Sequence, residues 1–119
     1  MTAGGAKVPL NTARENEVLI ARPEGRIDAL NAREFQSELS AAIDDEAGAV
    51  LLDLEDLSYI SSAGLRVILL VAKDLRKRDA KLALCSLQAP IREVFETSGF
   101  DQILALHASR AEALAALRG

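Results

Sequence analysis

The sequence is poor in aromatic and metal-binding side chains. It contains no tryptophan, one tyrosine and three phenylalanines, so its core must be built mainly from aliphatic residues. One cysteine, Cys85, and one histidine, His107, exclude an ordinary Cys/His metal site. Cys85 lies in an apolar run, where a lone thiol is typical of a small core residue in a reducing compartment.

Long apolar segments and basic patches are also missing. No apolar run reaches the roughly 18 residues of a membrane span, and the N-terminus lacks the apolar centre of a signal peptide. The formal net charge is −4, and we interpret the basic cluster Arg76–Arg78 as a solvated helix end. We therefore expect a cytoplasmic protein that neither inserts into membranes nor binds nucleic acid.

Catalytic motifs are absent as well. The seven glycines fit neither G-x-G-x-x-G nor the P-loop pattern, and no G-x-S-x-G elbow occurs. A serine hydrolase would need His107 to reach one of the serines 61–62, whereas we expect an exposed loop histidine. Asp53, Glu55 and Asp56 are conceivable Mg²⁺ ligands, but a buried Asp53 bonded to loop amides beside a solvated turn is the favoured interpretation. The sequence predicts no enzyme, metal or cofactor.

What is present is an alternation of strand and helix patterns in a chain of one-domain length. Expected strands span 7–13, 17–22, 50–54, 81–85 and 102–106, and 25–28 could resume the second strand. Expected helices span 31–44, 62–78, 90–97 and 109 onward. This pattern predicts an α/β domain at 7–119 after a disordered tail at 1–6, with a mixed central sheet of about four to five strands and about four α-helices.

Local signals mark several helix ends. Asn31 with Glu34, and Ser109 with Glu112, have the spacing of a capping box. Gly99 stands where a left-handed residue should end the third helix. Acidic residues at 44–46 oppose the dipole of the first helix, so that helix should end before them.

The most informative stretch is 50–65. A buried strand ends at Leu54, a short acidic loop follows, and Ser61 and Ser62 open the longest helix. A hydroxyl is thereby placed at the positive end of a helix dipole, where a phosphate is well tolerated. Because no catalytic partner accompanies these serines, the pattern indicates a switch.

Three segments together resemble STAS domains of the bacterial anti-sigma factor antagonist type. Residues 52–65, L-D-L-E-D-L-S-Y-I-S-S-A-G-L, resemble the signature of that family. Residues 25–28 resemble its G-x-[LI]-D, and residues 95–100 resemble its F-x-x-[ST]-G-[LF]. The order and spacing hold from about residue 7 to the end of the sequence. The resemblance implies a single STAS domain.

The resemblance also implies a function and a modified residue. The phosphorylated serine of the family falls on Ser62. Many members have aspartate at the preceding position, where Ser61 offers a second hydroxyl and is therefore the second choice. The unphosphorylated protein would bind an anti-sigma factor with serine kinase activity and be released on phosphorylation. A serine phosphatase would reset it. This chain would be the substrate of such partner switching, without a cofactor of its own.

The expected docking face joins two loops and the start of the long helix. It comprises Asp28, Ala29, Leu30, Asn31, Ser58, Tyr59, Ser61, Ser62 and Arg66. Asp28 would pair with a partner cation, orient the serine loop, or be an ordinary loop acid. Tyr59 would be an exposed anchor or a partly buried loop aromatic. Arg66, one turn after Ser62, would contact a phosphate or a partner acid, or be a plain exposed helix residue.

Two alternatives remain open at this point. One is a STAS interaction subunit of a lipid transporter or stress-signalling assembly that is never phosphorylated. The other is a small serine enzyme, against which the lack of a nearby base argues.

Overall fold

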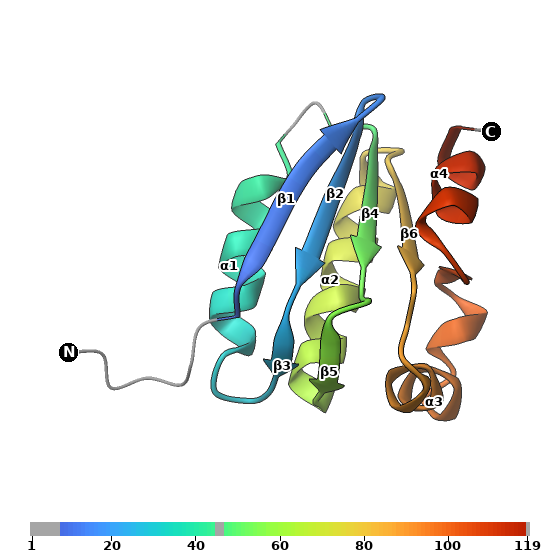
Figure 1. Cartoon of the computed structure of the whole chain (residues 1–119). Coiled ribbons are helices and arrows are strands. Elements are labelled where there is room, and N and C mark those ends of the chain that lie inside the picture. Colours follow the sequence, from blue (N-terminus) through green and yellow to red (C-terminus); the bar gives the residue numbers. More distant parts are fainter. Residues whose placement is uncertain (1–7, 45–46, 119) are drawn as a thin grey trace.

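A five-stranded mixed sheet in the order β1-β2-β4-β6-β7 forms the centre of the molecule (Figure 1). The computed structural model describes residues 8–44 and 47–118; the expected tail at 1–6 lies outside them. The strands of this sheet are β1 (Leu10–Glu15), β2 (Val18–Pro23), β4 (Ala49–Asp53), β6 (Lys81–Cys85) and β7 (Ala105–His107). β1 pairs antiparallel with β2, and the other neighbours pair in parallel. The expected α/β fold with a mixed sheet is confirmed.

Helices cover both faces of the sheet. They are α1 (Ala32–Ala42), α2 (Ser62–Lys77), α3 (Ala89–Thr97) and α4 (Arg110–Arg118), with a 3-10 turn at Phe100–Gln102. The buried residues of α1, α2 and α3 share one core cluster, whereas those of α4 pack on the opposite face. None of the helices in the described parts of the chain is both long and apolar enough to cross a membrane.

β4 shows why a continuous apolar run predicts a central strand. All five of its residues are buried. Val50 and Leu52 point into the core beneath α1 and α2, and Leu51 points into the smaller core beneath α4. The two-residue repeat of a strand therefore gives apolar side chains to both layers.

A second, two-stranded sheet corrects the expected acidic loop. Only residues 54–56 form a turn, and Leu57–Ile60 form β5, which pairs in parallel with β3 (Gly25–Ile27). The segment expected to resume the second strand therefore belongs to a separate sheet. β3 and β5 lie beyond the carboxyl ends of β2 and β4 (Figure 1). Gly25, at φ 84°, has the left-handed backbone that allows the chain to leave β2 and enter β3.

The structure differs from expectation at the start of one helix and at the start of one strand. Asn31 is the N-cap residue of α1, but its side chain makes no capping bond, so the predicted capping box with Glu34 is wrong. The expected strand at 102–106 begins only at Ala105, because a 3-10 turn occupies its first residue.

Other predicted helix signals are confirmed. α1 ends at Ala42, ahead of the acidic residues, of which 45–46 lie outside the described residues. Ser109 caps α4 by accepting a hydrogen bond from the Glu112 amide. Gly99 has φ 78° after α3.

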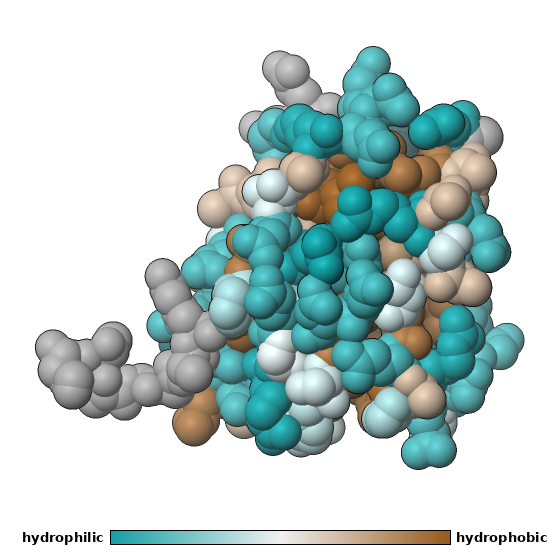
Figure 2. Space-filling model, in the orientation of Figure 1, coloured by the Kyte–Doolittle hydropathy of each residue, from teal (hydrophilic) through white to brown (hydrophobic). Residues whose placement is uncertain are grey.

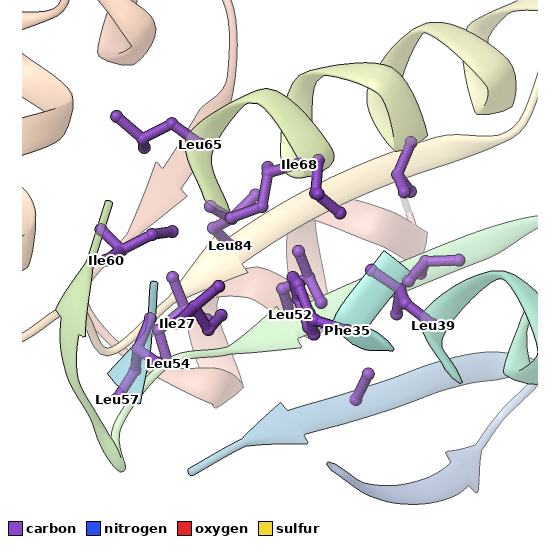
Figure 3. Packing of buried hydrophobic residues seen from close by; sticks show 14 of the residues in the cluster. Ile27, Phe35, Leu39, Leu52, Leu54, Leu57, Ile60, Leu65, Ile68 and Leu84 are labelled. Atoms are coloured by element: carbon purple, nitrogen blue, oxygen red, sulfur yellow. The ribbon is translucent and has the colours of Figure 1, made fainter. Parts of the chain in front are cut away.

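The core continues under the second sheet. Ile27, Leu54, Leu57 and Ile60 are at most 3% exposed and gather beneath the first turns of α2, in the core cluster that also contains Leu65 (Figure 3). Burying an aliphatic side chain of this size contributes about 1.5–3 kcal/mol. The start of α2 is therefore held on a packed base.

Candidate functional site

The predicted site residues converge where α2 begins, beside the two-stranded sheet. Ser61 is the N-cap residue of α2, and Ser62 is its first helical residue. The Ser61 amide donates a hydrogen bond to the Ile27 carbonyl at 2.8 Å, which ties the start of α2 to β3. In parallel α/β sheets, the carboxyl ends of the strands are the usual place for binding sites.

The two serines have different roles in the helix start. Ser61 is half-buried, and its hydroxyl oxygen accepts a hydrogen bond from the Gly64 amide at 3.2 Å. Ser62 is exposed, and no group among the described residues forms a hydrogen bond with its hydroxyl. The amides of Ser62 and Ala63 have no acceptor within the helix, as in any first turn. The Ser62 side chain is therefore the accessible one, beside partial positive charge.

Gly64 allows α2 to approach the small sheet closely. A Cβ atom at this position would lie 2.7 Å from both Ile27 Cγ2 and Ile60 Cγ1. Both isoleucines are buried and β-branched, so neither can move aside easily. A glycine in the first turn thus fixes how Ser61 and Ser62 are presented.

The loop from β3 to α1 is locked by reciprocal bonds between Asp28 and Asn31. The Asp28 amide donates to Asn31 Oδ1 at 2.8 Å, and the Asn31 amide donates to Asp28 Oδ1 at 3.1 Å. The Asn31 side-chain amide also donates to the Arg26 carbonyl at 2.9 Å. Asn31 is 4% exposed and supports the loop from beneath. The result is a rigid loop that carries Leu30 at 76% exposure.

β5 contributes Ser58 and Tyr59 to the same surface. Tyr59 is 40% exposed, and the Arg26 guanidinium lies 4.2 Å from the centre of its ring. The two residues are register partners across β3 and β5. The Ser58 hydroxyl donates to the Gly25 carbonyl at 3.0 Å. Cross-strand contacts therefore orient the ring, and the cation–π contact contributes about 0.5–1 kcal/mol.

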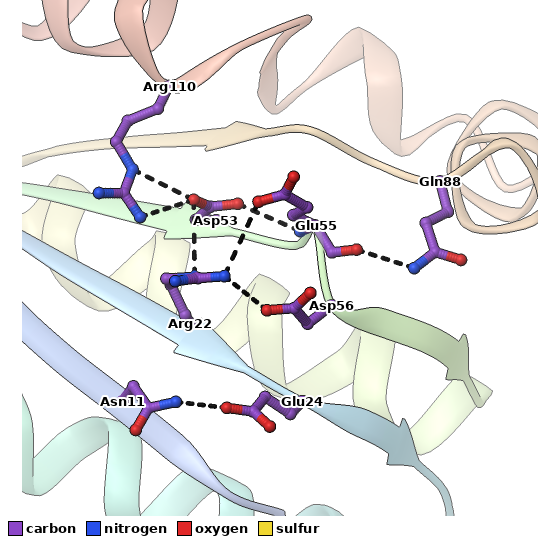
Figure 4. Close-up of polar contacts among 8 residues, drawn as sticks. All are labelled: Asn11, Arg22, Glu24, Asp53, Glu55, Asp56, Gln88 and Arg110. Atoms are coloured by element: carbon purple, nitrogen blue, oxygen red, sulfur yellow. Dashed lines mark hydrogen bonds and ion pairs between the residues drawn. The ribbon is translucent and has the colours of Figure 1, made fainter.

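A network of charged side chains lies at the carboxyl end of β4 (Figure 4), on a face whose middle is mostly hydrophilic (Figure 2). Asp53 is 2% exposed, and its Oδ1 accepts the Glu55 amide at 3.1 Å, as predicted for a buried acid bonded to the loop. Its Oδ2 accepts two bonds from Arg110 at 2.8 and 3.2 Å. Arg22 pairs with Asp56 and lies 3.8 Å from Asp53. These carboxylates are occupied by arginines that join β2 and α4 to the loop.

Cys85 and His107 lie away from the serines. Cys85 is fully buried, and this burial raises the pKa of its thiol above the usual value. It is the register partner of Asp53 on β4 and of His107 on β7. His107 is half-buried rather than an exposed loop residue, so that expectation was wrong. Among the residues the structure describes, no hydrogen bond links it to either serine, and no group of His, Cys, Asp and Glu could hold a metal ion.

Sequence reasoning missed three features of this surface. It did not find the Arg26–Tyr59 contact, because it treated Tyr59 as part of a loop. Gly64 was recognised only as part of the motif at 52–65. A glycine in the first turn of a long apolar helix is nevertheless a signal that the helix backbone approaches another element closely. Sequence reasoning also missed the bonds from Arg110 to Asp53, which join residues 57 positions apart.

Comparisons with known proteins agree with this architecture. The STAS domain model matches residues 9–113. BtrV of Bordetella bronchiseptica, assigned as an anti-sigma factor antagonist, is 48% identical over 101 residues, which cover 85% of this chain and 87% of BtrV. An anti-sigma factor antagonist from Mycobacterium paratuberculosis superposes with a TM-score of 0.86 at 21% identity, over 94% of this chain and 95% of that one.

A third comparison concerns SpoIIAA, an anti-sigma factor antagonist solved in its unphosphorylated form. It has a TM-score of 0.78 at 23% identity, over 93% of this chain and 97% of SpoIIAA. At such identities the two solved structures establish the fold alone.

Proposed function

Because the chain belongs to the STAS domain family, we propose that it is an anti-sigma factor antagonist that works by partner switching. In its unphosphorylated form it binds an anti-sigma factor with serine kinase activity. That partner transfers a phosphoryl group from ATP to Ser62, the complex dissociates, and a serine phosphatase restores the free hydroxyl. The chain is the substrate in this cycle and acts in the cytoplasm.

The observation that carries the proposal is the contrast between the two serines. Ser62 is exposed at the first position of α2, whereas the Ser61 oxygen already accepts the Gly64 amide as the helix cap. A kinase can reach Ser62 without disturbing the cap. Phosphorylation of Ser61 would require the cap to rearrange, at a cost of about 1 kcal/mol. Ser62 is therefore the acceptor we propose.

The start of α2 should tolerate a phosphate on Ser62. A phosphoserine carries about −1.5 to −2 charges near neutral pH. At Ser62 this charge meets the free amides of the first turn, and Arg66 follows one turn later on the same side of α2. No large conformational change is needed for the fold to accept it.

A partner docked on this surface should not tolerate a phosphate on Ser62. Asp28 and the exposed Leu30, Tyr59 and Arg66 surround the same helix start and form the proposed contact surface. A doubly charged group in the middle of such an interface costs several kcal/mol where it meets like charge or lacks a partner. Since 1.4 kcal/mol corresponds to about tenfold, affinity should fall by more than about a hundredfold.

The test is phosphorylation followed by mapping. The chain is incubated with ATP, Mg²⁺ and each anti-sigma factor kinase of the source genome, and intact mass is followed by peptide mapping. We expect one added phosphate, on Ser62, in the wild type and in Ser61→Ala, and none in Ser62→Ala. A phosphate on Ser61 in the wild type would overturn the assignment. No phosphate with any kinase would favour the STAS interaction subunit that is never phosphorylated.

Binding measurements with variants of Ser62 separate the effect of its charge from the effect of its hydroxyl. Ser62→Ala should bind the kinase as the wild type does, and Ser62→Asp should bind more weakly. Equal binding of the two variants would mean that charge is not what releases the partner. The phosphorylated wild-type chain serves as the control for the imperfect likeness of Asp to phosphate.

A further inference from the structure

The exposed side of α2 is basic in a chain that is acidic as a whole. α2 carries four basic residues and one acid, whereas the whole chain has 14 Lys and Arg against 18 Asp and Glu. The four cations, which we call the basic ridge, are Arg66, Lys73, Arg76 and Lys77. All four are exposed, and they follow Ser62 along the same helix.

In the described parts of the chain, the cations of the basic ridge form no ion pairs. Elsewhere arginines meet carboxylates, as in the pairs of Arg14 with Asp44 and of Arg110 with Asp53. Within residues 8–44 and 47–118, no carboxylate lies within ion-pair distance of any ridge residue. The ridge therefore presents four unpaired cations to solvent, with Asp74 beside them as the one acid of α2.

The end of the helix accounts for only part of this charge. Arg76 and Lys77 lie in the last turn of α2, where cations complement the helix dipole. Arg66 lies in the N-terminal half, where a cation gains nothing from the dipole, and Lys73 lies before the last turn. The helix dipole does not account for the cations at these two positions, whereas a binding partner would.

Apolar surface lies beside the ridge. A groove between α2 and the segment before β7 is lined by Leu69, Ala72, Ile103 and Leu104, with Lys73 and Arg76 at its rim. Ile103 is 56% exposed, and on the other side of the ridge Leu70 is 45% exposed. Apolar patches beside unpaired charges are typical of a protein–protein contact.

Nucleic acid and membranes fit this surface less well. Nucleic-acid bases stack on aromatic side chains, and the one tyrosine lies before the start of α2 and not along the ridge. The apolar side of α2 is buried in the core, so the helix has no apolar face to insert into a lipid surface.

We propose that the basic ridge receives an acidic surface of the same protein that phosphorylates Ser62. This inference rests on the proposed function and extends it by naming the charge of the partner. The argument is charge complementarity together with continuity, because the ridge begins one turn after Ser62. A partner docked at Ser62 and lying along α2 would cover all four cations.

The ridge gives phosphorylation a second effect. An acidic partner is drawn toward four unpaired cations, and such steering raises association rates by about 10–1,000-fold at low salt. A phosphate on Ser62 adds about −1.5 to −2 charges at one end of the ridge and cancels up to half of its charge. Phosphorylation should therefore slow association as well as speed dissociation.

The first experiment measures association rates with the kinase identified by the phosphorylation assay. Stopped-flow binding is compared at about 0.02 M and about 0.5 M salt, where the screening length falls from above 20 Å to about 4 Å. We expect Lys73→Glu/Lys77→Glu to associate about tenfold more slowly than the wild type at low salt and at nearly the same rate at high salt. The control, Arg14→Glu/Arg118→Glu, makes the same change in net charge at two residues outside the ridge and should change the low-salt rate less than about threefold.

The second experiment needs no natural partner. A peptide of ten glutamates is titrated into the ¹⁵N-labelled chain, and amide shifts are mapped. We expect shifts along α2 near the ridge that disappear in Lys73→Glu/Lys77→Glu and persist in the control variant. Shifts confined to other elements would overturn the inference, as would tighter binding of the ridge to duplex DNA or to phosphatidylserine vesicles than to the peptide.

The two proposals fail in different ways. If no kinase phosphorylates Ser62, the proposed function falls, and the peptide titration still decides whether the ridge selects acidic surfaces. If Ser62 is phosphorylated but the association rates of the wild type and Lys73→Glu/Lys77→Glu are equal at low salt, the basic ridge is not a docking surface and the proposed function stands.

Discussion

Gly64→Ala tests whether the close contact between α2 and the small sheet sets the geometry of the site. Helix propensity alone predicts that alanine stabilises the protein by up to about 1 kcal/mol. The packing predicts the opposite sign, because the new methyl would lie 2.7 Å from atoms of Ile27 and Ile60. Overpacking of a well-packed core costs about 1–3 kcal/mol. We expect a net loss of about 1–2 kcal/mol in the free energy of unfolding.

Urea denaturation and thermal unfolding measure this change. A loss of 1–2 kcal/mol in a domain of this size lowers Tm by roughly 3–10 °C. Gly48→Ala is the matched control, because a Cβ at Gly48 meets nothing within 4 Å. It should leave stability within about 1 kcal/mol of the wild type, on the stabilising side.

A double-mutant cycle identifies the contact itself. Ile27→Ala removes Cγ2 of Ile27, one of the two side-chain carbons that the new Cβ would meet at 2.7 Å, so Gly64→Ala should cost less in that background than in the wild type. The phosphorylation rate of Ser62 should fall in Gly64→Ala, because the start of α2 must shift. The reasoning is refuted if Gly64→Ala is as stable as the wild type or more stable, or if its cost is unchanged in Ile27→Ala.

Three further predictions concern other contacts. Ser61→Ala should lower the free energy of unfolding by about 1 kcal/mol through loss of the cap, while Ser62→Ala should change it by less than about 0.5 kcal/mol; equal effects would contradict the assigned roles. Asp53→Asn should cost about 1–3 kcal/mol in urea denaturation, because the bonds from Arg110 lose their charged acceptor, and a neutral result would make this pair dispensable. Burial raises the pKa of the Cys85 thiol above its usual 9.0, so the unfolded chain loses this proton first and stability should fall as pH rises above about 9. Cys85→Ala should show a smaller fall in the same urea titrations, and an identical pH profile would contradict the assignment.

The sequence was sufficient to predict the main sheet and the serine-bearing helix. β4 was recognisable because five consecutive residues had to be buried on two faces, and α2 because its apolar stripe spans many turns. Both signals are local, long and repeated, so they do not depend on any distant partner. The motif at 52–65 added the likeness to a family, which the comparisons confirmed.

The small sheet could not be predicted in the same way. β5 has four residues, buried only at its two ends, and this pattern resembles a loop as much as a strand. Its partner β3 has three residues and lies about thirty positions earlier in the chain. Such short segments become strands only through their pairing. Sequence patterns of single segments do not report on pairing.

Side-chain roles in the site depended on the same long-range geometry. Asn31 has the sequence signature of a helix cap, but its side chain bonds to Asp28 and to the Arg26 carbonyl. An asparagine can satisfy either arrangement, and the position of β3 decides between them. Asp53 was predicted to bond to the loop, but its second partner, Arg110, comes from the last helix.

The division of the strands into two sheets also bears on motion. β3 and β5 pair with each other, and across the described residues they share no strand ladder with the five-stranded sheet. A fluctuation that separates them breaks only a short ladder and leaves the larger one intact, so these amides should exchange with solvent sooner than those of β4. Because the Ser61 amide bonds to the Ile27 carbonyl of β3, such local opening would loosen the start of α2 while most of the domain stays folded.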